Sequence, residues 1–81
     1  MTSLLLGGNK LTQLPIEIGN LTNLTSLGLS CNQLTQLPVE IGRLTNLTSL
    51  DLRDNHFSNN KQEEIKRLLP NCKILFYDND R

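Results

Sequence analysis

A pattern of leucine and asparagine recurs every 23 residues along this 81-residue chain. Each of three asparagines, Asn9, Asn32 and Asn55, follows two leucines in alternation. The repetition extends to whole phrases, LTQLPIEIGNLTNLTSL at 11–27 and LTQLPVEIGRLTNLTSL at 34–50. A fixed period in the twenties is typical of solenoids, in which each unit buries its apolar face against its neighbours. The sequence therefore predicts one solenoid domain over residues 1–81.

Residues 24–46 show what one unit is expected to do. Leu27 and Leu29 alternate with small residues, which predicts a short strand whose leucines face the core. Asn32 follows at an inward position where the chain turns, and a buried amide is unfavourable unless it is hydrogen bonded. We therefore predict a structural ladder of asparagines that bond to backbone groups of their own and neighbouring turns, formed by Asn9, Asn32, Asn55 and Asn79.

The second half of the unit is expected to return to the start of the next strand. Pro38 has no amide hydrogen and a fixed φ, which suits an extended return segment. Ile41, Leu44 and Leu47 bring the other side of the coil back to the core. Gly42 is expected to permit a tight bend there.

The repeated pattern L-x-x-L-x-L-x-x-N-x-L-x-x-L-P-x-x-I-G-x-L resembles the leucine-rich repeat family over essentially the whole chain. The match is to the 23-residue bacterial and plant-intracellular type, which is similar to the repeats of intracellular Ras-scaffold proteins. The resemblance implies an α/β fold. In that fold, a right-handed solenoid carries a short parallel β-sheet on its concave side and loops or 3-10 turns on its convex side.

The end of the chain departs from the repeat after Phe57. The repeat units are 1–23, 24–46 and 47–58, and residues 59–81 are expected to form a C-terminal cap. Apolar residues at helical spacing predict one helix near 60–69, with Asn60 and Glu63 as a capping box and Pro70 as the stop signal. A last strand is expected near 73–77.

Composition removes several classes of function. Eight basic and eight acidic residues give no net charge, which disfavours binding to nucleic acid or to an anionic membrane. No apolar run approaches the roughly 20 residues that span a bilayer, and the first residues do not resemble a signal peptide. Cys31 and Cys72 have neither disulfide-cap nor metal-site spacing, so we expect a cytoplasmic protein with no metal and no cofactor.

The expected binding residues follow from the resemblance, because family members generally contact ligands through the outward residues of the concave strands. Carried over position by position, the candidate ligand-binding residues are Ser26, Ser30, Ser49, Asp51, Arg53, Asp54, Lys73, Leu75 and Tyr77. Arginine and tyrosine are frequent hot-spot residues at protein interfaces. The alternative is that Asp51 and Arg53 are solvated neighbours that pair across strands.

The predicted function is a non-enzymatic module that binds a protein or peptide on this concave sheet, as part of a larger signalling or scaffold protein. The alternative is self-assembly into a homodimer through the N-terminal repeat, where the edge strand at 3–7 carries consecutive leucines. Cys31 and His56 are the residues closest to a catalytic pair, but catalysis would also need an orienting group and an oxyanion site. We therefore predict that the protein is not an enzyme.

Overall fold

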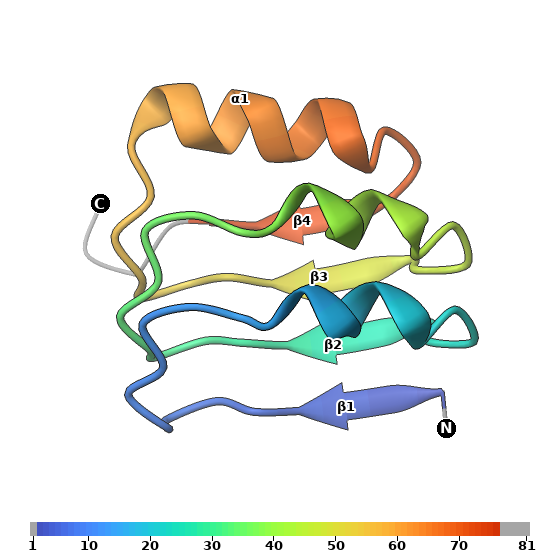
Figure 1. The fold of residues 1–81 in the computed structure, drawn as a ribbon. Coiled ribbons are helices and arrows are strands. Elements are labelled where there is room, and N and C mark those ends of the chain that lie inside the picture. The colour runs from blue at the N-terminus through green and yellow to red at the C-terminus, as the bar shows by residue number, and fades with distance from the viewer. Residues whose placement is uncertain (1, 77–81) are drawn as a thin grey trace.

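The computed structural model describes residues 2–76, which form a four-stranded parallel sheet backed by helical segments (Figure 1). The strands are β1 (Ser3–Leu5), β2 (Ser26–Gly28), β3 (Ser49–Asp51) and β4 (Lys73–Leu75), and they lie side by side in sequence order. The register joins equivalent positions of successive repeats, with Leu4 beside Leu27, Leu27 beside Leu50 and Leu50 beside Ile74. Each repeat is thus one coil of a solenoid, as the sequence predicts.

The convex side changes character along the array. The first two coils carry 3-10 helices, η1 (Ile16–Asn20) and η2 (Val39–Arg43), and the third carries the α-helix α1 (Asn59–Leu68) (Figure 1). Pro15 and Pro38 precede the 3-10 helices in extended conformation, with ψ of 154° and 148°. The predicted 3-10 turns and single C-terminal helix are therefore present. Among the described residues, no helix is long and apolar enough to cross a membrane.

The repeated leucines form one continuous core. The inward leucines of the second coil are at most 1% exposed: Leu24, Leu27, Leu29, Leu34 and Leu44. The first-coil counterparts of Leu27, Leu29, Leu34 and Leu44 pack against the same core but are only partly buried: Leu4, Leu6, Leu11 and Leu21. The asymmetry arises because, within residues 2–76, the first coil has a neighbouring coil on one side only.

The start of α1 corrects one expectation from the sequence. The N-cap is Ser58, whose Oγ accepts a hydrogen bond from the Lys61 backbone N–H at 3.2 Å, so Asn60 and Glu63 do not form a capping box. Asn60 lies inside the helix, where its backbone is already helical. The helix covers 59–68, within one residue of the range near 60–69 that the sequence predicts, and Leu69 and Pro70 follow it.

The two convex glycines, Gly19 and Gly42, lie within the 3-10 helices, and neither has a positive φ. Gly42 does not have the positive φ that a glycine-specific turn requires, which corrects the expected tight bend there. At the equivalent Gly19, a Cβ atom would lie 2.8 Å from the Glu40 carbonyl oxygen and 2.9 Å from the Glu40 Cβ. Gly19 therefore allows η1 and η2 to approach each other.

One equivalent position in each of the three coils adopts the left-handed conformation, and Lys10 in the first coil adopts it as well, with φ of 58°. Gly8, Cys31 and Asp54 are equivalent residues with φ of 75°, 58° and 60°. Only glycine reaches this region without a steric penalty from Cβ.

We expect Cys31→Gly to raise the free energy of unfolding by roughly 0.5–1 kcal/mol, the left-handed penalty less the entropy of a more flexible unfolded chain. Urea unfolding measures this change. The control is Ser30→Gly at the preceding residue, which has no positive φ and is expected to lose stability. A Cys31→Gly variant no more stable than the parent chain would contradict the expectation.

Candidate functional site

The concave face of the sheet presents the predicted binding residues in columns. The register places Ser3, Ser26, Ser49 and Lys73 in one column, and Leu5, Gly28, Asp51 and Leu75 in the next. Ser49 and Lys73 are exposed, whereas Ser26, Asp51 and Leu75 are partly buried by their neighbours. Tyr77 and Asn79 lie outside the described residues.

Asp51 and Arg53 form the most ordered polar feature of this face. The Asp51 carboxylate accepts hydrogen bonds from Arg53 Nε and Nη2, both at 2.9 Å, and from the Arg53 backbone N–H at 3.2 Å. The Arg53 guanidinium beside it lowers the pKa of the Asp51 carboxyl. The pair joins the last residue of β3 to a residue of the following turn in the same coil, and not residues of two strands as the alternative above expected.

The N-terminal half of the face carries no charged side chain, and its one large apolar side chain is that of Leu5. The Leu5 side chain is 77% exposed and leans over the neighbouring strand, since a Cβ on Gly28 would lie 3.0 Å from Leu5 Cδ2. Ser30 lies partly buried beyond Gly28 along the second coil. The concave face therefore passes from an apolar end at Leu5 to a charged end at Arg53 and Lys73.

Cys31 and Asp54 meet where the strands lead into the turns. The Cys31 Sγ lies 3.5 Å from Asp54 Oδ2, and both cysteines have free thiols. Burial raises the pKa of the Cys72 thiol on the opposite side of the coil. Within residues 2–76, no three histidine, cysteine or acidic side chains are grouped closely enough to hold a metal ion.

The ladder asparagines tie each turn to the coil before it. Asn32 is 5% exposed; its Oδ1 accepts from the Asn9 and Leu11 backbone N–H groups, both at 2.9 Å. Its Nδ2 donates to three carbonyl oxygens, those of Leu6, Leu29 and Ser30. Asn55 repeats the arrangement one coil later, accepting from the Leu34 N–H and donating to the Leu29, Leu52 and Arg53 carbonyls.

Asn9 makes far fewer bonds in the described structure. Its Nδ2 donates to the Leu6 carbonyl at 2.9 Å, and within residues 2–76 its side chain makes no other hydrogen bond. Asn9 is exposed, whereas Asn32 at the same position of the next coil is buried. The asparagine side chain therefore makes five hydrogen bonds in the second coil and one in the first.

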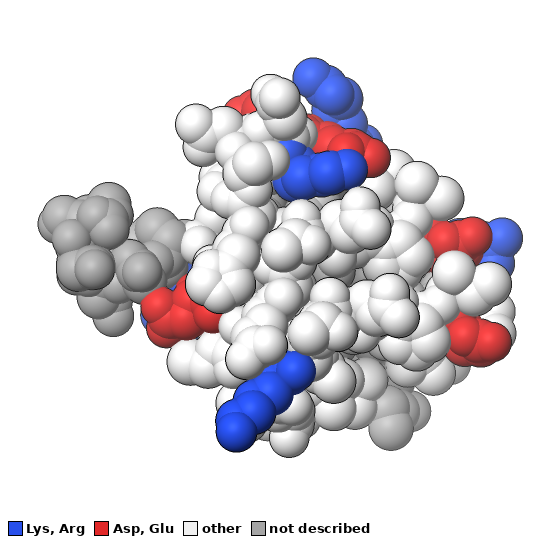
Figure 2. Space-filling model, turned by 60° about the vertical axis from the view of Figure 1, so that its left-hand side comes forward, with Lys and Arg blue, Asp and Glu red and all other residues white. Residues whose placement is uncertain are grey.

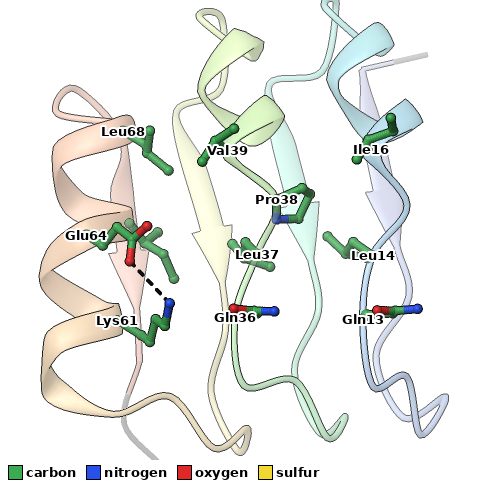
Figure 3. A pocket seen from close by; sticks show the side chains of 11 residues that line it. Gln13, Leu14, Ile16, Gln36, Leu37, Pro38, Val39, Lys61, Glu64 and Leu68 are labelled. Carbon is green, nitrogen blue, oxygen red and sulfur yellow. Dashed lines mark hydrogen bonds and ion pairs between the residues drawn. The ribbon is translucent and has the colours of Figure 1, made fainter.

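Sequence reasoning missed a groove of about 310 Å³ between the first two coils and α1 (Figure 3). Equivalent residues of the two coils line one side, with Gln13 and Gln36 followed by Leu14 and Leu37. Lys61 and Glu64 form an ion pair at 3.5 Å on the α1 side. The signal available in the sequence was that two apolar residues, Ile16 and Val39, follow the repeated Leu-Pro pair at equivalent positions. In the structure these two residues are 59% and 62% exposed.

The flank of the solenoid at the strand ends is largely uncharged. In Figure 2, which brings this flank forward, charged side chains lie mainly at the margins of the view. The sequence agrees, because segments 9–16 and 32–39 contain Lys10 as their only charged residue. This flank therefore offers amide, hydroxyl and apolar groups to a partner, in contrast to the Asp51–Arg53 end of the concave face.

Comparison with known proteins identifies the fold. Residues 1–57 match the leucine rich repeat family model, and a second leucine rich repeat model matches residues 46–72. The chain therefore belongs to the leucine-rich repeat family. Among solved structures it is similar to the leucine-rich repeat protein LIC12759 of Leptospira interrogans, with 51% sequence identity and a TM-score of 0.79.

The similarity covers 80% of this chain but only 17% of the Leptospira protein, so the chain spans about one sixth of that protein's length. No curated protein matches the chain. Leucine-rich repeat domains generally mediate protein–protein interaction and are generally non-catalytic.

Proposed function

We propose that this chain is a non-enzymatic recognition module that binds a protein or peptide on its concave sheet, next to Asp51 and Arg53. The observation that carries the proposal is the three-bond contact between Asp51, the last residue of β3, and Arg53 in the turn that follows. A polar group held in place before binding loses little entropy when a partner arrives. Lys73 and Leu75 on the adjacent strand add a cation and an apolar surface.

The size of the face sets the expected strength of binding. Four strands about 4.8 Å apart, each of three residues and so roughly 10 Å long, give a face on the order of 200 Å². A standard interface uses about 800 Å² per partner. We therefore propose weak binding by this face alone, strengthened when the module forms part of a larger scaffold or signalling protein. Two free cysteines support a reducing compartment, so cytoplasm is the proposed location.

The test compares two charge-neutral double variants. Asp51→Ala with Arg53→Ala removes the concave ion pair, and Lys61→Ala with Glu64→Ala removes a helix ion pair outside the concave face. A partner captured by the immobilised chain is expected to bind the first variant about tenfold or more weakly, because the fixed polar anchor is lost. The second variant is expected to bind like the parent chain.

Biosensor titration of the captured partner measures both effects. Equal affinity for the parent and the concave variant would move the binding site away from this face. Weaker binding by the helix variant alone would place it at the groove beside α1.

A second candidate function, self-association through the first coil, is favoured by the exposed Leu5 side chain on β1.

A further inference from the structure

The groove beside α1 exposes an apolar side chain that has neighbouring elements on both sides. Val39 lies in η2, which packs against η1 on one side and α1 on the other, and its side chain is still 62% exposed. Ile16 holds the same position in the first coil and is 59% exposed. The exposure of Val39 therefore belongs to its outward position within the coil and does not depend on the ends of the array.

The groove has a polar end and an apolar end (Figure 3). Gln36 of the second coil and Lys61 of α1 lie at one end, and Val39 and Leu68 lie across from each other at the other end. The volume of about 310 Å³ is close to the lower limit of roughly 300 Å³ for ligand pockets. A space of this size takes a short stretch of chain and not a folded domain.

The backbone that borders the groove has hydrogen-bonding groups without protein partners. Within residues 2–76, the N–H and C=O groups of Gln36 and Leu37 take part in no hydrogen bond. The residue before a proline favours extended backbone, and Pro38 itself is extended with ψ of 148°. Leu37 packs on the core and Gln36 is exposed, so their backbone groups point along the array, alternately toward the first coil and toward α1. One of these two residues therefore offers its N–H and C=O groups to the groove.

The charges of the groove favour an uncharged partner. The two charged side chains that line it, Lys61 and Glu64, already pair with each other at 3.5 Å. Gln13 and Gln36 supply the other polar side chains, and within residues 2–76 neither amide makes a hydrogen bond. A charged group that entered the groove would lose water without gaining an unpaired opposite charge, whereas hydroxyl and amide groups would find donors and acceptors.

We propose that this groove binds an extended, uncharged segment of a partner protein that runs alongside residues 36–39. One leucine-like side chain of the segment lies between Val39 and Leu68. The backbone of the segment bonds to the N–H and C=O groups of Gln36 or Leu37, which is how extended peptides add to an open strand edge. Hydroxyl or amide side chains of the segment meet the Gln36 amide at the polar end.

Titration of a peptide into the isotope-labelled 81-residue chain, followed by nuclear magnetic resonance, tests the proposal. The probe is a capped peptide of about seven residues, with leucine at its centre and serine and threonine elsewhere. We expect a dissociation constant of about 0.1–1 mM, as fits a contact of a few side chains, and shifts of the Gln36 and Leu37 amide signals. The Asp51 and Arg53 signals are expected to stay in place. Unmoved Gln36 and Leu37 signals at about 5 mM peptide would overturn the proposal.

Two matched variants test where the leucine side chain binds. Val39→Lys is expected to weaken peptide binding at least about tenfold, because it places a charge where the leucine side chain would be buried. Leu5→Lys places the same charge at an exposed apolar residue of the concave face, and this variant is expected to bind the peptide like the parent chain. Circular dichroism confirms that each variant is folded. Unchanged binding by Val39→Lys, or a greater loss with Leu5→Lys, would refute the proposed site.

Two methylated probes test the backbone pairing. N-methylation of the central leucine and N-methylation of the residue after it remove N–H donors from opposite edges of the extended peptide. We expect the two affinities to differ at least about fivefold, because only one of the donors faces the groove, and equal affinities would contradict the pairing.

The proposed groove site is independent of the proposed concave site at Asp51 and Arg53. The double variant with Asp51→Ala and Arg53→Ala is expected to bind the peptide like the parent chain. Failure of the groove proposal would therefore leave the concave proposal unaffected, and weaker binding by this double variant with unchanged binding by Val39→Lys would place the peptide on the concave face.

Discussion

Asn32→Ala is expected to lower the free energy of unfolding by about 3 kcal/mol, a large share of the stability of a chain this size. The substitution removes an acceptor for two backbone N–H groups and a donor to three carbonyl oxygens. The Asn9 and Leu11 N–H groups would then lack partners in a partly buried turn. An unsatisfied buried group costs about 1–3 kcal/mol, more than the hydrogen bond itself contributes.

The matched control is Asn9→Ala, at the same position of the first coil. Its amide donates one exposed hydrogen bond, so we expect a loss of about 0.5–1 kcal/mol. Urea unfolding of the two variants provides the comparison. Equal losses of stability would contradict the prediction, because they would mean that the contribution of each asparagine does not depend on the number of its side-chain hydrogen bonds.

Gly19→Ala is expected to destabilise the protein by about 2 kcal/mol, in the range for overpacking a tight contact. The added Cβ would lie 2.8 Å from the Glu40 carbonyl oxygen, which belongs to the η2 backbone and cannot rotate away. Relief requires η1 and η2 to separate, which also disturbs the leucines beneath them. Thermal unfolding measures the effect as a lower midpoint.

The repeat supplies its own control for this prediction. At the equivalent Gly42, a Cβ would lie 3.5 Å from the Leu68 carbonyl oxygen, an ordinary contact distance. Gly42→Ala is expected to change stability by less than about 0.5 kcal/mol, with a gain favoured by the stiffer unfolded chain. Similar losses at both glycines would mean that backbone freedom, and not the spacing between convex elements, explains their presence.

The leucine period was sufficient to predict the sheet and the core. Strand direction, strand order and the inward leucines all follow from one rule: equivalent residues of successive coils lie side by side. Leu27 and Leu50 are neighbours in the structure because they are 23 residues apart in the sequence. The same rule placed the candidate binding residues in columns. Their role in binding stays a prediction.

Features that depend on differences between coils were not accessible from the pattern. Gly19 and Gly42 stand in nearly identical phrases, but one faces a 3-10 helix and the other faces α1. The groove beside α1 exists because that helix replaces the 3-10 helix of earlier coils, so its volume depends on their relative placement. The N-cap residue was predicted wrongly because serine and asparagine are equally good N-cap residues, and Ser58 was as plausible as Asn60.

The side chains of Asn32 and Asn55 each accept a hydrogen bond from a backbone N–H group in the turn of the preceding coil. If one coil were transplanted into another protein without the coil that follows it, the turn of the transplanted coil would lack these hydrogen bonds. This would hold even though its 23-residue repeat was complete. The unit that can be transplanted extends from one turn to the asparagine of the following coil. Chimeric arrays built with joints directly after that asparagine should keep every turn anchored.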